Sequence, residues 1–285
     1  MEIIFDRVSA DYQIGPIRTP LVLHDVNVKL ASGSYTAVVG YTGAGKSSLL
    51  KAMNGLLIPI QGQVKIGSDL IKQDHNKNAL KSIRKKVGMV FQFPESQLFA
   101  ETVEKDICFG PLNFGVSLED AKEVAKKVIQ QVGLSVDVLE KSPFSLSGGQ
   151  KRRVAIAGIL AMEPDILVLD EPGAGLDPSG KKEIMDLISS WHKERGLTTV
   201  LVTHDMEDVI SYADEVIVME KGTIVFHDTA QVLFSNTEQV EKWHLDAPDA
   251  RRFQLELEKK TGITLNRICL TVEDLADALI EVGLV

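Results

Sequence analysis

The stretch GYTGAGKSS, residues 40–48, decides the fold of this chain. It completes an apolar run, TAVVG, and opens an apolar helix pattern, SSLLKAMNGL. The glycine spacing matches the phosphate-binding loop, in which a strand leads through a tight turn into a helix. Glycines let the backbone wrap an anion, and the N–H groups at a helix N-terminus point toward it. The stretch therefore predicts a nucleotide site built largely by backbone amides.

The side chains of this loop have separate expected roles. Lys46 is expected to reach the β- and γ-phosphates as a point charge, and the Ser47 hydroxyl is expected to bind Mg²⁺. The N–H groups of residues 43–48 are expected to face the phosphates. The other nucleotide-binding positions expected in the loop are Gly40, Thr42, Gly43, Ala44, Gly45 and Ser48.

The segments around the loop indicate an α/β domain. Residues 34–40, 165–171 and 197–204 are continuously apolar and β-branched, as in strands buried on both faces of a parallel sheet. Residues 118–132 and 181–194 place apolar side chains on one helical stripe. Such alternation of strands and helices is typical of α/β folds. The stripe of the first helix is Leu118, Ala121, Val124, Val128 and Val132.

The two ends of the chain differ from this middle part. Residues before about 30 and residues 215–228 predict antiparallel strands, the second pair with a turn at Lys221-Gly222. The C-terminal part predicts short helices, with Thr271 and Asp274 as a helix N-cap pair. The expected domains are a main domain at 3–229, its helical subdomain at about 93–160, and an α-rich appendage at 230–285.

Polar side chains follow two of the predicted strands. The strand ILVLDEP, residues 166–172, ends in Asp170 and Glu171, at the edge where open α/β sheets bind ligands. Asp170 is expected to hold Mg²⁺ through water, and Glu171 to orient and deprotonate the attacking water. The next such strand ends in VTHDM, where His204 is expected to donate a hydrogen bond to the γ-phosphate.

A second helix start carries glycines and polar residues. LSGGQKRR, residues 146–153, precedes the apolar run VAIAGILAM. Ser147, Gly148, Gly149 and Gln150 predict another anion-binding helix N-terminus with exposed N–H groups. One ATP does not need two cradles from the same chain. We therefore expect this stretch to bind the ATP of another subunit, placed head to tail with this one.

Composition restricts the classes of function. The formal net charge of −9 argues against nucleic-acid binding, which needs a basic surface, and against broad adsorption to anionic membranes. Cys108 and Cys269 are far apart and are expected to be free thiols in a reducing compartment. No apolar stretch approaches the ~18 residues of a membrane span, and the N-terminus lacks the layout of a signal peptide. A soluble cytosolic protein is expected, with any membrane role supplied by a partner.

Five motifs together resemble the ATPase of ABC transporters: GYTGAGKS, LSGGQ, ILVLDEP, GLDP and THD. The resemblance covers about residues 3–240. It implies a P-loop NTPase with a mostly parallel core sheet, an antiparallel β subdomain and an α-helical signature subdomain. It also implies that Gln92 contacts Mg²⁺ and couples to a membrane subunit, that Tyr12 stacks on adenine, and that Asp177 lies in a loop crossing to the other subunit. ATP and Mg²⁺ are the implied ligands.

Two longer stretches, residues 91–115 and 142–178, resemble the ATPases of energy-coupling factor (ECF) transporters, which import vitamins and metal ions. EPGAGLDP, residues 171–178, resembles the second of the two paralogous ATPases in these transporters. The implied partners are that paralogous ATPase, an integral membrane coupling subunit (T component) and, indirectly, a substrate-binding membrane protein (S component). The implied location is the cytoplasmic face of the cell membrane, and the C-terminal helices are expected to contact the other ATPase.

Three positions depart from the commoner family residues: Ala44 replaces Ser, Ser48 replaces Thr and Gly173 replaces Thr. Two other functions stay open at this point. One is a soluble ABC ATPase that acts on DNA or ribosomes, and the other is a regulatory subunit that binds ATP without turnover. The predicted helix at 248–262 is either a subunit contact or an amphipathic helix packed on its own domain.

Overall fold

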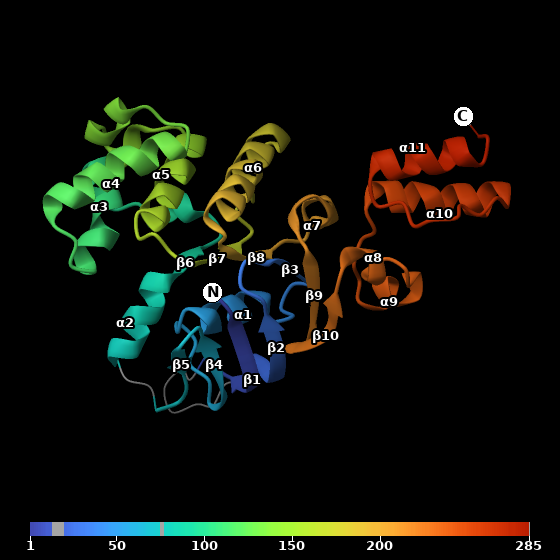
Figure 1. Cartoon of the computed structure of the whole chain (residues 1–285), viewed down its shortest axis with the longest axis horizontal. Coiled ribbons are helices and arrows are strands. Elements are labelled where there is room, and N and C mark those ends of the chain that lie inside the picture. Colours follow the sequence, from blue (N-terminus) through green and yellow to red (C-terminus); the bar gives the residue numbers. More distant parts are fainter. Residues whose placement is uncertain (13–19, 75–76, 285) are drawn as a thin grey trace.

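The computed structural model describes residues 1–12, 20–74 and 77–284 and places them in two sheets flanked by helices (Figure 1). The N-terminal sheet is antiparallel, with strand order β2-β1-β4-β5. It confirms the antiparallel strands expected before residue 30. Its strands are β1 (Ile3–Ala10), β2 (Leu23–Leu30), β4 (Gln61–Ile66) and β5 (Asp69–Ile71).

The central sheet has the strand order β10-β9-β3-β8-β7-β6. Strands β6, β7, β8, β3 and β9 pair in parallel in this order. Strands β9 and β10 form an antiparallel hairpin. Its central strands are buried on both faces, which explains their continuous apolarity and confirms the α/β class. The strands are β3 (Tyr35–Val39), β6 (Val87–Val90), β7 (Ile166–Asp170), β8 (Thr198–Val202), β9 (Glu215–Glu220) and β10 (Thr223–Asp228).

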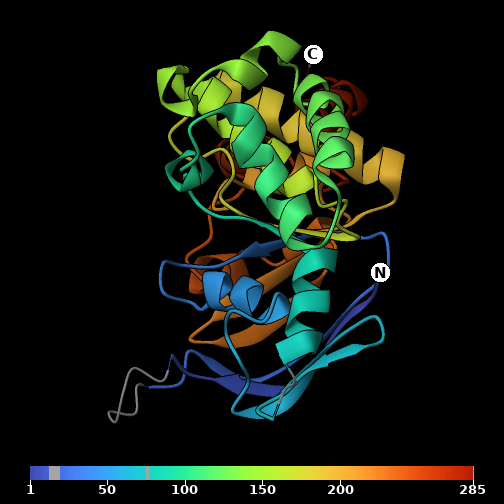
Figure 2. The same cartoon turned by 90° about the vertical axis from the view of Figure 1, so that its left-hand side faces the viewer.

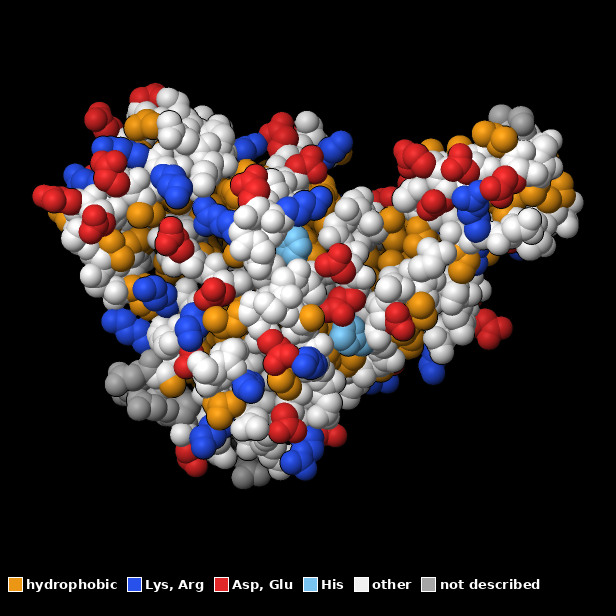
Figure 3. Space-filling model, viewed as in Figure 1, with side chains coloured by type: hydrophobic (Ala, Val, Ile, Leu, Met, Phe, Trp, Pro, Cys, Tyr) orange, Lys and Arg blue, Asp and Glu red, His pale blue; other side chains and the backbone are white. Residues whose placement is uncertain are grey.

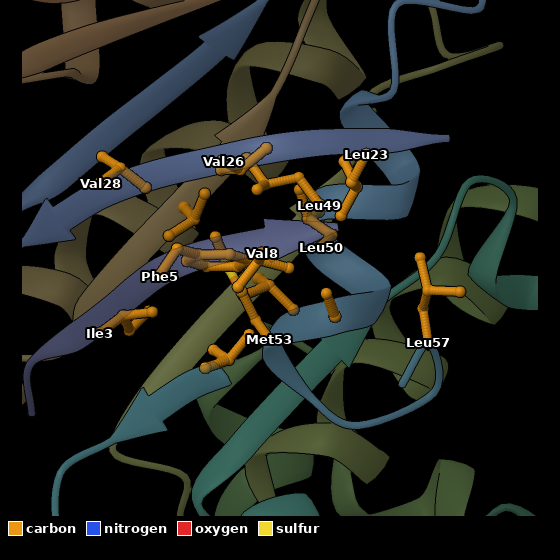
Figure 4. Close-up of a cluster of buried hydrophobic side chains, with 14 of the residues drawn as sticks. Ile3, Phe5, Val8, Leu23, Val26, Val28, Leu49, Leu50, Met53 and Leu57 are labelled. Atoms are coloured by element: carbon orange, nitrogen blue, oxygen red, sulfur yellow. The ribbon is translucent and has the colours of Figure 1, made fainter. Parts of the chain in front are cut away.

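The helix after the phosphate-binding loop, α1 (Lys46–Met53), packs into a core shared by the two sheets. Leu49, Leu50 and Met53 point toward apolar side chains of β1 and β2 (Figure 4). The same core includes apolar side chains of the central strands β7 and β8. Because α1 is enclosed in this way, the loop at its N-terminus has a fixed position relative to the central sheet.

Helices stack over the opposite face of the central sheet, away from the antiparallel sheet (Figure 2). The helices expected at 118–132 and 181–194 are present as α4 and α6. Leu118 was expected on the apolar stripe but is 56% exposed, because α4 begins there; Ala125 and Ile129 are buried instead. The elements on this face are η1 (Pro94–Gln97), α3 (Val103–Asn113), α4 (Leu118–Gln131), η2 (Val136–Glu140), η3 (Pro143–Ser145), α5 (Gly148–Leu160) and α6 (Pro178–Arg195). Helix α2 (Lys77–Lys86) instead packs with the antiparallel sheet, where Leu80 and Ile83 join the shared core.

The C-terminal helices fall into two groups. Phe234 and Trp243, from the first group, pack with Val39 and Val218 of the central sheet. The second group, α10 and α11, pairs around its own small core and projects from the body (Figure 1). The expected N-cap pair at Thr271 is present as a capping box with Asp274. The helices are α7 (Met206–Tyr212), α8 (Ala230–Leu233), α9 (Thr237–Lys242), α10 (Asp249–Thr261) and α11 (Val272–Glu281).

The division expected at residue 229 stays a prediction, since apolar contacts of α8 and α9 with β3 and β9 cross that position. Within the described residues, no helix combines the length and apolarity needed to cross a bilayer.

A buried arginine connects three segments near the end of β7. Arg152 of α5 is 2% exposed and makes two hydrogen bonds with the Glu95 carboxylate of η1, at 2.9 and 2.8 Å. Its guanidinium also donates to the carbonyl oxygens of Pro172 and Ala174, at 3.2 and 2.7 Å. Burial alone would raise the pKa of Glu95, but the hydrogen bonds and charge of Arg152 outweigh it and lower the pKa. This contact joins the helical subdomain to the turn after Glu171.

Replacing Arg152 with Met is expected to lower the free energy of unfolding by about 3 kcal/mol, since Glu95 keeps some contact with water and the loss lies at the lower end for a broken buried pair. The measurement is urea unfolding followed by circular dichroism. Lys151→Met, one residue earlier in α5, is the control and is expected to change stability by less than about 0.5 kcal/mol. Equal stability of the two variants would contradict the role given to the buried pair.

Candidate functional site

The phosphate-binding loop has the backbone geometry that its glycines predict. Gly40 and Gly45 have φ angles of 142° and 104°, which favour glycine. A Cβ on Gly40 would lie 2.3 Å from the Met219 carbonyl oxygen, and one on Gly45 would lie 3.0 Å from the Val22 carbonyl oxygen. Neither position accepts a side chain without a shift of the backbone. The loop is therefore pressed against β9 and the start of β2.

Lys46 is positioned at the first turn of α1, inside the curve of the loop. Its ammonium group donates to the carbonyl oxygens of Gly40 and Tyr41, at 2.6 and 3.0 Å. Burial lowers the pKa of Lys46, while the nearby carboxylates of Glu171 and Asp170 act in the opposite direction. The arrangement places one cation in the loop and two carboxylates beside it.

Ser47 and Asp170 meet across the gap between α1 and β7. The Ser47 hydroxyl donates to the Asp170 carboxylate; burial raises the pKa of this carboxyl group, and the hydrogen bond partly offsets that effect. A hydroxyl and a carboxylate are hard oxygen ligands of the kind that Mg²⁺ takes alongside substrate phosphates. These two side chains therefore fit the expected Mg²⁺, which supplies charge neutralisation of the phosphates when bound.

Glu171 lies at the centre of a small polar group. Its backbone N–H donates to the Val202 carbonyl at 3.0 Å, which holds the ends of β7 and β8 together. One carboxylate oxygen accepts a hydrogen bond from Gln92 Nε2 at 3.0 Å, and the other lies 3.3 Å from His204 Nδ1. The φ angle of Glu171 is 49°, an uncommon value for a residue with a side chain. The chain turns sharply there and directs the carboxylate away from the sheet.

A cavity of about 650 Å³ brings most of these groups together. It is lined from the loop by Lys46 and Ser47, and from the strand ends by Gln92, Asp170 and Glu171. Thr42, Gly43, Gly45 and Ser48 line it as well, whereas Ala44 is buried beneath the loop. Gly40 and His204 contact lining residues without lining the cavity themselves.

One wall of the cavity was not anticipated from the sequence. The β9–β10 turn contributes Lys221 and Gly222, and β2 contributes His24. The Gly222 N–H donates to the Ala44 carbonyl at 2.8 Å, and the Lys221 N–H donates to the Tyr41 hydroxyl at 3.1 Å. The sequence marked Lys221-Gly222 only as a hairpin turn, because nothing in its spacing shows that the turn lies over the loop.

The LSGGQ stretch lies apart from this cavity. Ser147 is the N-cap of α5: its hydroxyl accepts from the Gln150 N–H at 3.3 Å, and the Gln150 side chain accepts from the Ser147 N–H at 3.1 Å. Gly148 and Gly149 are exposed, and a Cβ on either would meet nothing within 4 Å. None of these four residues lines the cavity of the phosphate-binding loop. The stretch is an exposed helix N-terminus that is open to a second molecule.

Two residues expected near the nucleotide also lie outside the cavity. The Tyr12 hydroxyl lies 3.0 Å from Ser48 Oγ, and Lys51 lies over its ring, but Tyr12 lines a neighbouring cavity of about 310 Å³. Asp177 is exposed and caps α6, accepting the Gly180 N–H at 2.9 Å. Both positions leave their side chains within reach of solvent, and their expected roles stay predictions.

Sequence reasoning missed the contribution of Glu95 and Arg152. The two residues stand in FPE and GGQKRR, next to stretches that were singled out for other reasons. A cation at the start of an apolar helix is a usable signal for a buried ion pair, although the sequence does not say which carboxylate it meets.

Comparison with known proteins agrees with this geometry. The ABC transporter family model matches residues 23–174. The chain is 54% identical over 282 residues to the energy-coupling factor transporter ATP-binding protein EcfA2 of Geobacillus kaustophilus, covering 98% of this chain and 96% of that protein. It is 52% identical over 276 residues to the protein of the same name from Bacillus licheniformis, covering 97% and 96%.

Solved structures give the same result. The chain resembles cbiO1 from Clostridium perfringens, part of the ABC transporter complex cbiONQ, with a TM-score of 0.73, 32% identity, and coverage of 92% of this chain and 98% of that one. It also resembles the ATP-binding cassette MJ0796, solved as a dimer bound to ADP and Pi, with a TM-score of 0.70, 28% identity, and coverage of 80% and 98%.

Replacing Lys46 with Ala is expected to weaken ATP binding about 10- to 100-fold, because hydrogen bonds from a charged donor contribute about 1.5–3 kcal/mol. The measurement is titration of the purified chain with a fluorescent ATP analogue. Lys126→Ala, on the exposed face of α4, is the matched control and should bind like the wild type. Wild-type affinity of the Lys46 variant would remove the assignment of this loop to the phosphates.

Proposed function

Since the chain belongs to the ABC transporter family and, within it, to the energy-coupling factor transporter ATP-binding proteins, we propose that it is the ATP-hydrolysing motor of a micronutrient importer. ATP binding closes this chain against a paralogous ATPase, closure moves the membrane subunits, and hydrolysis reopens the pair. One observation supports this proposal most: Lys46, Asp170 and Glu171 line one cavity, and His204 lies beside Glu171.

Hydrolysis by this site is direct attack of water on the γ-phosphorus. The Glu171 carboxylate accepts the proton of that water, the bond from phosphorus to the bridging oxygen breaks, and ADP and phosphate leave. Lys46 neutralises charge on the β- and γ-phosphates, and His204 orients the γ-phosphate by a hydrogen bond. Catalysis of this kind rests on positioning and charge neutralisation, with no covalent intermediate on the enzyme.

Each ATP site is completed by residues of both subunits. Ser47, Asp170 and Gln92 are the side chains that would hold Mg²⁺, and Tyr12 receives the adenine. Ser147, Gly148, Gly149 and Gln150 bind the γ-phosphate of the partner's ATP, and Asp177 lies in the loop that reaches the partner. The exposed N–H groups at the start of α5 support this head-to-tail arrangement.

The surface beside Gln92 fits a membrane partner. Between η1, α3 and α5 lies a cavity of about 550 Å³, and its lining includes Leu98, Phe99, Phe109 and Ile159. Phe99 and Phe109 form an edge-to-face pair with ring centroids 4.9 Å apart and are 60% and 53% exposed. An exposed aromatic pair over a hollow is a suitable anchor site for an apolar helix. We assign this groove to a coupling helix of the integral membrane subunit.

The C-terminal helices fit the second partner. Apolar side chains lie on the surface of the projecting lobe that α10 and α11 form (Figure 3). Phe253, Val272 and Ile280 of this lobe are 52%, 70% and 60% exposed. An amphipathic helix packed only on its own domain would bury such side chains. We therefore assign the lobe, within an appendage at 230–285, to contact with the paralogous ATPase.

The proposed assembly places this chain at the cytoplasmic face of the cell membrane. The chain reaches the membrane through the T component and, through it, serves the S component that captures the substrate. The two alternatives receive less support. Its relatives are named as transporter proteins rather than as DNA or ribosome factors, and Glu171 with His204 provides what turnover needs.

Replacing Glu171 with Gln is expected to keep ATP binding and to slow hydrolysis about 10²- to 10⁴-fold, the usual contribution of a general base. The measurement is phosphate release by the purified transporter complex, with ATP binding measured separately. Glu119→Gln, on the exposed start of α4, is the control and should hydrolyse ATP at the wild-type rate. Unchanged turnover of the Glu171 variant would rule out this residue as the base.

The proposed partners are tested by purifying the tagged chain from detergent-solubilised membranes of its host and identifying bound proteins by mass spectrometry. A second ABC ATPase and a membrane-spanning subunit are the expected companions. Phe99→Asp should lose the membrane subunit and Phe253→Asp should lose the paralogous ATPase, because each places a charge in an apolar contact. Recovery of ribosomes or DNA-repair proteins instead would move the function to another class.

A further inference from the structure

One cation of α6 touches the two segments that carry the proposed base and the proposed γ-phosphate contact. Lys181 extends its ammonium group to the carboxylates of Asp205 and Asp208, at 2.5 and 2.8 Å. The side chains of Lys181 and Asp208 are 25% and 11% exposed, so water screens this pair weakly, whereas Asp205 is 38% exposed. Asp205, the residue after His204, is the N-cap of α7, and Asp208 lies in the first turn of that helix.

The first turn of α7 is held by a chain of short contacts. Asp205 is the N-cap and accepts the Glu207 N–H at 2.9 Å. The Thr203 hydroxyl donates to Asp208 at 3.1 Å and accepts the Asp205 N–H at 3.0 Å. His204 lies between Thr203 and Asp205, so its backbone position follows from these contacts. The ammonium group of Lys181 forms ion pairs with both carboxylates.

The pKa shifts of Lys181, Asp205 and Asp208 show that the three side chains interact with one another. Burial works against the charged form of Lys181, but hydrogen bonds from its ammonium to the two carboxylates outweigh it and raise the pKa of the lysine. The pKa of Asp205 is lowered despite burial, chiefly through Lys181. Burial raises the pKa of Asp208, although the same lysine opposes it. Removing the cation would leave the carboxylates of Asp205 and Asp208 without the ammonium group that they share.

The stem of the same lysine packs against the turn that follows Glu171. A Cβ on Gly173 would lie 2.7 Å from Lys181 Cγ, so the missing side chain at position 173 is what lets the lysine pass. The backbone N–H of Lys181 also donates to the Asp177 carbonyl at 2.9 Å, within the first turn of α6. Lys181 therefore lies between Asp177, the turn after Glu171 and the start of α7.

We propose that Lys181 is a positioning residue for ATP hydrolysis: it holds His204 against Glu171 by tying the first turn of α7 to the first turn of α6. Because Asp177 caps α6, a shift of that residue at a subunit interface would reach the first turn of α7, and with it His204, through Lys181. The proposal rests on the function assigned above, in which Glu171 and His204 act on ATP. Lys181 itself touches neither reacting atom.

The test uses the intact transporter complex carrying this chain. Lys181→Met keeps the aliphatic stem and removes the charge, and it is expected to lower kcat for ATP about 10- to 100-fold, the cost of a misplaced catalytic group, with KM within about threefold of the wild type. Lys181→Arg keeps a cation in reach of both carboxylates and should recover most of the rate. Lys182→Met, one residue along on the exposed face of α6, should leave both constants unchanged.

A second pair of variants tests the fit at position 173. Gly173→Ala should lower kcat in the wild-type background, because its Cβ displaces the lysine stem. In a Lys181→Ala background, where that stem is gone, Gly173→Ala should have little further effect. Such non-additivity is the signature of two residues that act through one contact. Full additivity of the two substitutions would contradict the proposed packing of Lys181 over Gly173.

Hydrogen exchange of the isolated chain provides a readout that does not depend on turnover. Amides of the first turn of α7 should exchange faster in Lys181→Met than in the wild type, and Lys181→Arg should exchange as slowly as the wild type. Unchanged exchange and unchanged kcat in Lys181→Met would overturn the proposal. A parallel loss of ATP affinity and rate that Lys181→Arg does not recover would assign Lys181 a structural role. A wild-type complex without ATP turnover would overturn the proposed function. In that case hydrogen exchange would still show whether Lys181 holds the first turn of α7 in place.

Discussion

The parallel pairing of β3, β8, β7 and β6 is the constraint on which the site depends. The carboxyl ends of parallel strands lie at one edge of a sheet, so whatever follows these four strands must meet there. The phosphate-binding loop follows β3, Glu171 follows β7, His204 follows β8 and Gln92 follows β6. Residues far apart in the chain, such as Lys46 and Glu171, thus line one cavity because the strand ends bring them together. The hydrogen bond from the Glu171 N–H to the Val202 carbonyl holds the carboxyl ends of β7 and β8 together.

Arg152 and Lys181 both contact the short turn after Glu171. Arg152 donates to the carbonyls of Pro172 and Ala174, while the stem of Lys181 packs against Gly173. The turn itself has few side chains that could anchor it, and Glu171 adopts a backbone conformation that few such residues adopt. Contacts from α5 and α6 therefore supply the rigidity that the turn lacks. The same two helices are capped by the exposed residues Ser147 and Asp177, so each connects an exposed N-terminus with the turn after Glu171.

The sequence predicted the elements that depend on interactions between residues close together in the chain. Continuous apolar runs gave β3, β7 and β8, and the glycine spacing gave the loop, because strand burial and phosphate binding each leave a pattern within a few residues. β6 was missed, since four residues directly after a basic helix carry no such pattern. Contacts that join distant segments were missed for a different reason. Arg152 and Lys181 look like surface cations in the sequence, and only the fold shows that they meet Glu95 and the start of α7.

The separation of the α5 N-terminus from the cavity has a consequence for genetic complementation between defective copies of this chain. In the proposed pair, Glu171 serves one ATP and Ser147 serves the other, so damage to these two residues of one chain falls on different sites. If the chain paired with its own copy, a mixed pair made of two differently damaged chains would regain one intact site. When the partner is a different paralogue, each complex contains a single copy of this chain, and the two defects cannot compensate for each other. Because these two residues serve different sites, complementation between two defective alleles of this gene depends on whether the partner is a second copy of this chain or a paralogue.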